Sequence, residues 1–91
     1  GREIMKIIDD ETLEIEMIVP SNWLRWIKPG VVSPIIIDET GKKYLAEISR
    51  IGAQVDPVSQ TIRIFARLKG DTEDVLAGMS GTAYFITPAE N

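Results

Sequence analysis

The sequence predicts an all-β fold: a small six-stranded, mainly antiparallel β-barrel capped by one short α-helix at about residues 21–28. Three observations predict it. Segments 12–19 and 61–69 alternate apolar and polar residues with the period of two that half-buried strands show. Short turns containing Gly, Pro and Asp separate the apolar segments, as between antiparallel strands. With so little helical patterning the strands imply a small barrel or sandwich, and a barrel closes its own strand edges, which suits a chain this short.

The composition describes one globular domain, and we treat residues 1–91 as a single β-barrel domain. Hydrophobic residues make up 44% and charged residues 26%, so one modest core is expected rather than disorder. The net charge of -4 argues against nucleic acid as a partner. Because the chain has neither Cys nor His, disulfides, thiol nucleophiles, His-based triads and the usual zinc ligands are excluded.

The first two strands are expected at 3–8 and 12–19, with the acidic turn 9–11 between them. In the second, one face is predicted to point into the core, and its members are Leu13, Ile15, Met17 and Val19. Pro20 should end this strand because proline donates no hydrogen bond to a ladder.

The segment "SNWLRWIKPG" (21–30) contains both tryptophans. Ser21 is a candidate helix cap, and helical spacing places Trp23, Leu24, Trp26 and Ile27 on one side. A helix this short must pack on something, so we expect it to close one end of the barrel. Trp23 and Ile27 should then be buried and Trp26 partly exposed, whereas the alternative is an exposed aromatic binding patch.

The middle of the chain should form a hairpin from strands 31–38 and 44–55, joined by the turn 39–43. Pro34 inside the first strand implies an edge position or a bulge. Gly52 inside the second marks a bend or bulge.

The last third should contain a turn at 56–60, a strand at 61–69, a loop at 70–81 and a final strand at 82–87. Asp56 followed by proline is the preferred start of a type I turn, and residues 88–91 are interpreted as a frayed end. Five glycines have expected roles. Chain reversal should require positive φ at Gly30, Gly41 and Gly70, and close packing should require Gly78 and Gly81 at the entry to the last strand.

Acidic residues cluster at 9–11, 38–39 and 71–74, but we interpret all three clusters as solvated turns. The last is similar to the start of a calcium loop, yet it lacks the glycine and the glutamate that such a loop needs later. Since nothing in the sequence places two carboxylates in one pocket, we expect a non-enzymatic protein without metal or cofactor.

The strand "TIRIFARLK" (61–69) carries the best-marked candidate contact surface. Its polar face contains Arg63, Phe65, Arg67 and Lys69. Three interpretations stay open for this face: a solubilising outer surface, a protein contact, or a nucleotide site in which the aromatic ring stacks on a base.

The ordered series of motifs in "AEISRIGAQVDPVSQTIRIFARLKGDTEDVLAGMSGTAYF" (46–85) resembles the β-barrel domain of membrane fusion proteins of the HlyD-like family. These are periplasmic adaptor subunits of tripartite efflux pumps, especially of the resistance-nodulation-division type. The motifs are Ile51, Val55-Asp56, Thr61, the basic strand 63–68, Leu76 with Gly78-Met79, and Ala83–Phe85. In the first half, "TLEIEMIVP", "WIKPG" and "TGKKYLAEI" are similar to family segments, so the match spans about residues 3–86. The chain departs from the family at Gln60, where arginine is common, and at Ala77, where proline is common.

The resemblance implies a structural and interaction domain excised from a longer multidrug-efflux adaptor, located in the periplasm and anchored to the inner membrane. The expected partners are an inner-membrane transporter and neighbouring adaptor subunits in a ring. The outer-membrane channel would be reached through other domains of the full protein. Nucleic acid is not an expected partner, and the isolated domain should be monomeric. The alternative is a free-standing small-barrel module that binds a nucleotide or an oligonucleotide.

Overall fold

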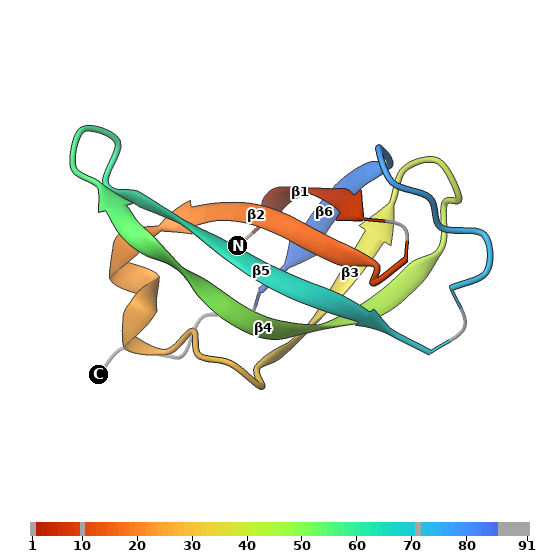
Figure 1. Ribbon diagram of the computed structural model, residues 1–91, viewed down its shortest axis with the longest axis horizontal. Helices are drawn as coiled ribbons and strands as arrows, with labels where there is room; N and C mark the ends of the chain where they lie inside the picture. The colour runs from red at the N-terminus through yellow and green to blue at the C-terminus, as the bar shows by residue number, and fades with distance from the viewer. Residues whose placement is uncertain (1, 10, 71, 86–91) are drawn as a thin grey trace.

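The computed structural model describes residues 2–9, 11–70 and 72–85. In these residues six strands form a closed, fully antiparallel barrel in the order β1-β2-β5-β4-β3-β6 (Figure 1). The elements are β1 (Arg2–Asp9), β2 (Glu14–Pro20), the 3-10 helix η1 (Ser21–Arg25), β3 (Val32–Ile37), β4 (Lys43–Asp56), β5 (Thr61–Lys69) and β6 (Ser80–Tyr84). The predicted six-stranded antiparallel barrel is therefore confirmed.

The core follows directly from the alternation in the sequence. On β2 the side chains of Ile15, Met17 and Val19 are at most 1% exposed, and they face inward as predicted. The register of β2 with β5 places Met17 opposite Ile64, so the apolar residues of both strands enter the same interior. Leu13, which was also expected on this face, is partly buried against the core just before the strand begins.

Strand β4 is longer than its neighbour β3 and extends past it. The β3–β4 pairing covers β4 only as far as Glu47, and the last contacts are two hydrogen bonds of Ile48 with Gly30 and Val31. From residue 49 to 56 the described ladder joins β4 to β5 alone. The end of the β4–β5 hairpin consequently projects from the barrel, as Figure 1 shows at its upper left.

The bulge predicted at Gly52 is confirmed. Between the pairs Ile51↔Ile64 and Val55↔Ile62, β4 contains three residues and β5 contains only Arg63. A Cβ built on Gly52 would lie 2.8 Å from the carbonyl oxygen of Arg63, which is too close for any side chain. Glycine therefore lets the bulged strand lie directly against β5.

The turn at 57–60 is organised by Asp56, as expected. Its carboxylate accepts hydrogen bonds from the backbone N–H groups of Val58 (2.9 Å) and Ser59 (3.3 Å). Its carbonyl oxygen accepts one from Gln60 at 2.8 Å. These backbone donors, Val58 first, hold the pKa of the Asp56 carboxyl below its ordinary value of 3.8.

The predicted α-helix at 21–28 is wrong in type and length, because the structure has a 3-10 helix that ends at Arg25. Ser21 makes no side-chain cap, and Pro20 occupies the cap position. The backbone N–H of Ser21 is instead bonded to the carbonyl of Gln60 at 2.9 Å, which ties the start of η1 to the β4–β5 turn. The backbone N–H of Gly30 is in turn bonded to the carbonyl of Ile48 at 2.8 Å, so both ends of the segment 21–30 are anchored to other parts of the barrel.

The tryptophans pack on the end of the barrel, but Trp23 is only partly buried, contrary to expectation. The rings of Trp23 and Trp26 lie 5.2 Å apart, and both meet Phe85 edge-on at 5.7 and 5.9 Å. Ile27 is 1% exposed, as predicted. Because all three rings pack against one another and against the core, this cluster is a cap of the barrel rather than an exposed binding patch.

The barrel closes at a short seam between β3 and β6. Their pairing covers only residues 35–37 of β3, so Pro34 lies outside this ladder, consistent with the edge position predicted for it. Gly81 is closely packed there as expected, since a Cβ would lie 2.0 Å from the carbonyl oxygen of Ile36. Gly78 is different: it has a φ of +93° and open space around the Cβ position, so conformation rather than packing requires glycine.

The boundaries of the last strand also differ from expectation. β6 begins at Ser80 rather than at residue 82, because Ser80 and Gly81 already pair with Lys6 and Met5 of β1. The predicted end of this strand at 86–87 and the predicted frayed end at 88–91 lie outside the described residues. The positive φ expected at Gly30, Gly41 and Gly70 is present, with values of 97°, 69° and 87°.

Candidate protein-contact surface

One outer face of the barrel carries a dense set of charged side chains, which we call the outer charged face. Strand alternation turns Arg63, Phe65, Arg67 and Lys69 of β5 outward together, as predicted. Neighbouring strands add residues in register, namely Lys6 of β1, Glu14 and Glu16 of β2, and Glu47 and Arg50 of β4. The face therefore contains five cationic and three acidic side chains, with one aromatic ring among them.

The acids of the adjacent strands partly neutralise the basic strand. Glu16 lies 3.8 Å from Arg63 and 3.6 Å from Lys6, and Glu47 lies 2.8 Å from Lys69. Arg67 is opposite Glu14 in the β2–β5 register and opposite Glu47 in the β4–β5 register. The strand β5, which is basic in the sequence, thus belongs to a surface that carries charges of both signs.

Arg50 is the residue that the sequence analysis missed. Its guanidinium lies 3.7 Å from the centroid of the Phe65 ring and 3.5 Å from the carboxylate of Glu14. This cation–π contact covers one face of the ring, so only the opposite face remains for a stacked base. The arrangement therefore does not favour the nucleotide-binding interpretation of this strand.

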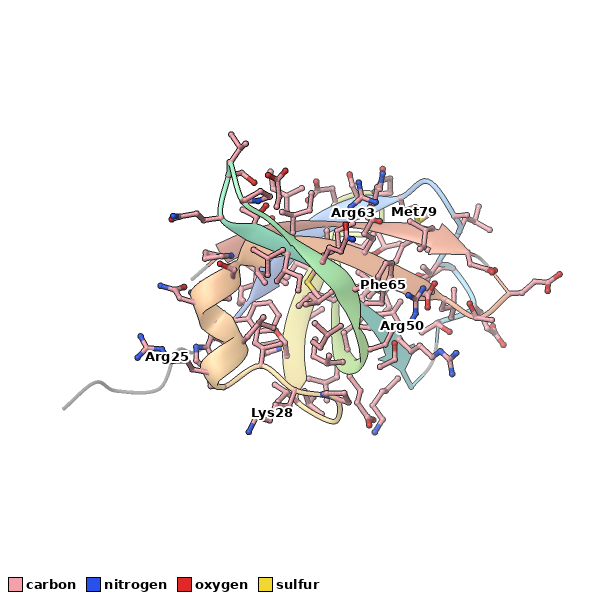
Figure 2. The ribbon with its side chains drawn as sticks, turned by 60° about the vertical axis from the view of Figure 1, so that its left-hand side comes forward. Arg25, Lys28, Arg50, Arg63, Phe65 and Met79 are labelled. Carbon is pink, nitrogen blue, oxygen red and sulfur yellow. The ribbon has the colours of Figure 1, made fainter. Side chains whose placement is uncertain are left out.

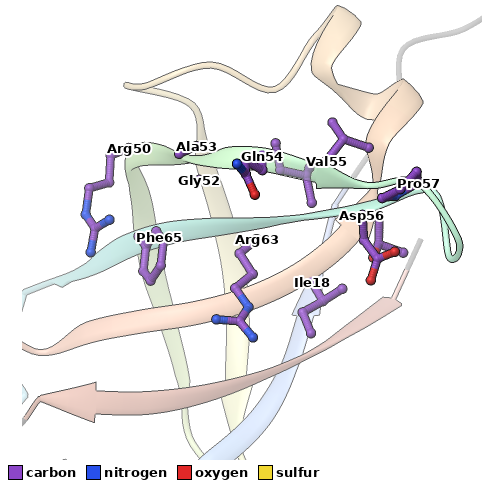
Figure 3. A pocket seen from close by; sticks show the side chains of 12 residues that line it. Ile18, Arg50, Gly52, Ala53, Gln54, Val55, Asp56, Pro57, Arg63 and Phe65 are labelled. Carbon is purple, nitrogen blue, oxygen red and sulfur yellow. The ribbon is translucent and has the colours of Figure 1, made fainter.

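An open groove of about 730 Å³ runs along the outer charged face beside the β4 bulge (Figure 3). Its apolar lining includes Ile18 and Val55, which are 50% and 42% exposed, together with Phe65. Arg50 and Arg63 border it on the same side of the sheet, and Asp56 lies toward its other end (Figure 3). Figure 2 shows that Arg25 and Lys28, the cations of the tryptophan segment, belong to the end of the molecule that carries η1 and lie away from Arg50, Phe65 and Arg63.

Each acidic cluster has a member whose carboxylate accepts a hydrogen bond within the structure. Asp9 accepts hydrogen bonds from the N–H groups of Glu11 and Thr12, at 2.8 and 3.3 Å. Glu39 accepts one from Ser80 at 3.1 Å. Within the described ranges, no three Asp, Glu, His or Cys side chains are grouped so that they could hold a metal ion.

Asp74 connects the 70–79 loop to the β3–β4 turn. The Lys42 ammonium lies 2.8 Å from its carboxylate, and the Tyr44 hydroxyl donates to it at 3.2 Å. The hydrogen bond from Lys42 is the main reason that the pKa of Asp74 is lowered. This carboxylate therefore has a structural role in holding the loop.

No family model matches the chain, and no curated protein sequence matches it significantly. Among the helical residues that the structure describes, none belongs to a helix long and apolar enough to cross a membrane. The resemblance to adaptor barrels and the roles that it implies accordingly stay predictions.

Proposed function

We propose that this chain is a non-enzymatic interaction domain, the β-barrel domain of a periplasmic adaptor subunit of a tripartite efflux pump. The observation that carries the proposal is the outer charged face, a rigid sheet surface with exposed cations, interleaved acids and a bordering groove. The ordered sequence motifs from 46 to 85 support the assignment to an adaptor.

The charges of this face contribute little to the stability of the barrel. The side chains of Arg50, Arg63 and Lys69 are 57%, 67% and 55% exposed, and solvent screens ion pairs at such positions. Surface pairs of this kind typically contribute about 0–1 kcal/mol. The residues are consequently available for recognition, where complementary charges set partner choice and orientation.

In this role the barrel contacts the periplasmic part of an inner-membrane transporter and neighbouring adaptors in a ring. Other domains of the full adaptor reach the outer-membrane channel. The full protein is periplasmic and anchored to the inner membrane. Such a domain needs a stiff shape and a selective surface rather than chemistry, and a closed barrel supplies the stiffness because each of its six strands is hydrogen-bonded to two neighbouring strands.

The proposal is tested in the full adaptor with Arg63→Glu combined with Arg67→Glu. The double variant should fold normally, because both side chains are exposed, yet it should lose pump assembly. A matched control is Arg25→Glu combined with Lys28→Glu, which changes the same charge at exposed positions that lie away from Arg50, Phe65 and Arg63 (Figure 2). The measurements are ethidium efflux in cells and chemical crosslinking to the transporter.

Efflux by the Arg63/Arg67 variant should fall toward that of a strain without the adaptor, and the control should keep normal efflux. Normal efflux with a folded Arg63/Arg67 variant would show that this face is not the contact surface. Equal loss in both variants would show that the effect is one of net charge.

A further inference from the structure

The groove beside the β4 bulge has apolar lining residues, with Arg50 beside Phe65 toward one end, Arg63 between Phe65 and Ile18, and Asp56 at the other end (Figure 3). We infer that it binds a short extended segment of a partner protein in which a Glu or Asp lies next to aliphatic residues. This inference rests on the proposal that the domain works by protein contact, and it names the part of the surface and the chemistry of the segment.

The apolar lining is accessible. Ile18 comes from β2, Phe65 from β5 and Val55 from β4, so three strands contribute apolar side chains to the groove. Ile18 and Val55 each keep two fifths or more of their surface in water. Covering these side chains with aliphatic groups of a partner removes apolar surface from water, which is the main favourable term in association.

The cations favour a carboxylate beside Phe65. Arg50 and Arg63 meet Glu14 and Glu16 at 3.5 and 3.8 Å, longer than the 2.7–2.9 Å of a well-formed charge-assisted hydrogen bond. Since a guanidinium has five N–H donors, both arginines retain capacity for another oxygen ligand. A carboxylate bound near Phe65 can therefore accept hydrogen bonds from Arg50 on one side and from Arg63 on the other.

The acidic residues exclude the competing polyanion. A nucleic acid would bring successive phosphates past Glu14 and Glu16, whereas one or two carboxylates need only the neighbourhood of the arginines. Asp56 at the far end repels a second anion there and favours an apolar or basic residue (Figure 3). The groove therefore has positive charge around Phe65 and negative charge at the Asp56 end. This difference selects the orientation of the bound segment as well as its charge.

The backbone keeps the groove open without a ligand. At the bulge, Gly52 lies so close to β5 that a Cβ would be 2.8 Å from the Arg63 carbonyl oxygen, and the Ser49 hydroxyl donates to the Phe65 carbonyl at 3.1 Å. These contacts hold the projecting part of β4 against β5 while the residues between Ile51 and Val55 have no β5 partner. A preformed site lowers the ordering cost of binding.

The test is a titration of the ¹⁵N-labelled chain with two capped peptides, followed by NMR. The acidic probe is Ser-Gly-Glu-Leu-Glu-Ile-Ser-Gly, and the matched probe replaces both Glu by Gln. The acidic peptide should shift the amides of Ile18, Arg50, Val55 and Phe65 saturably, with a dissociation constant on the order of 1 mM. The shifts caused by the Gln peptide should not saturate over the same concentration range, and added salt should weaken binding of the acidic peptide.

Two arginines of the same strand give a matched pair of variants. Arg63→Ala should weaken binding of the acidic peptide about tenfold or more, because hydrogen bonds to charged groups are lost. Arg67→Ala removes an equal charge from the same face but outside the groove, and it should leave the affinity unchanged. The amide spectrum of each variant shows directly whether the barrel is folded, and Arg50→Ala provides a second variant should Arg63→Ala disturb the strand.

Several results would overturn the inference. These are equal shifts with both peptides, shifts centred outside the groove, or equal weakening in the Arg63 and Arg67 variants. Tighter binding of an oligothymidylate at the same amides would assign the groove to nucleic acid, and shifts that depend on protein concentration alone would assign it to a second copy of the chain.

The proposal of a peptide-binding groove and the proposal of an adaptor role can be refuted independently. Absence of peptide binding together with lost efflux in the Arg63/Arg67 variant overturns the groove and leaves the adaptor role intact. Peptide binding together with normal efflux keeps the groove as a peptide site and shows that the outer charged face is not the contact surface for the pump.

Discussion

Replacing Gly81 by alanine tests the claim that the β3–β6 seam closes the barrel. The new Cβ would lie 2.0 Å from the carbonyl oxygen of Ile36 and 2.9 Å from the Cα of Ile37, whereas real Cβ contacts essentially never fall below 3.0 Å. Both neighbours are backbone atoms, so no side chain can rotate away. β6 must therefore move by about 1 Å from β3, a distance at which close-packed cores lose contacts and gain strain.

The expected cost combines two effects. Overpacking of a core typically costs about 1–3 kcal/mol. The seam pairs only three residues of β3, and weakening two of its hydrogen bonds adds about 2 kcal/mol at roughly 1 kcal/mol each. We expect Gly81→Ala to lower the free energy of unfolding by about 3–5 kcal/mol, a large share of the roughly 5–14 kcal/mol available to a domain of this size.

The assay is urea denaturation followed by tryptophan fluorescence and circular dichroism. Thermal unfolding should show a midpoint lower by about 12 °C or more, since each kcal/mol corresponds to about 4–8 °C in a domain of this size. Thr82→Ala is the control, because it removes atoms from the neighbouring residue of the same strand without a clash. A loss below about 1 kcal/mol for Gly81→Ala, or a loss equal to that of the control, would refute the geometry of the seam.

The remaining predictions concern the aromatic cap and the Asp56 turn. Trp23→Ala and Trp26→Ala should destabilise the barrel by similar amounts, about 2–4 kcal/mol each in urea denaturation, because both rings are partly buried and both contact Phe85. If neither substitution changed the free energy of unfolding, the segment 21–30 would instead be interpreted as an exposed binding patch. The pKa of Asp56 is depressed in the folded state, so its contribution to stability is present above pH 3.8 and is lost as the pH falls through the folded value. Asp56→Asn should therefore flatten the pH dependence of stability below about pH 4, and a carboxyl ¹³C titration that places the Asp56 pKa above 3.8 would contradict the assignment.

The alternation of β2 and β5 made the fold predictable to a large extent. A strand turns successive side chains to opposite faces, so a local pattern identifies which face is buried. Ile15, Met17 and Ile64 were placed correctly for this reason, and so was the outward face of β5 with Arg63 and Phe65.

The tryptophan segment shows where local patterns stop being sufficient. Spacing of apolar residues is similar for an α-helix and for a shorter 3-10 turn, and the choice depended on anchors elsewhere in the chain. Ser21 is bonded to Gln60, and Gly30 is bonded to Ile48, both distant in sequence. These bonds anchor both ends of the segment to residues that no local spacing identifies, and Trp23 between them is half-buried.

The contact surface was only half predictable. Arg63, Phe65, Arg67 and Lys69 are on one strand, and period two alone groups them. The groove, in contrast, needed Ile18 from β2 and Arg50 from β4.

By itself, then, the sequence determined the six strands, the buried faces of β2 and β5, the turns and the position of the Gly52 bulge, because these depend on neighbouring residues. Only the tertiary structure decided which acidic residues lie beside the basic strand and that Arg50 lies on Phe65. It also decided that a groove lies beside the β4 bulge and is lined by both of these residues. The physical reason is that register, strand order and barrel closure bring together residues far apart in the chain, and no local period encodes those distances.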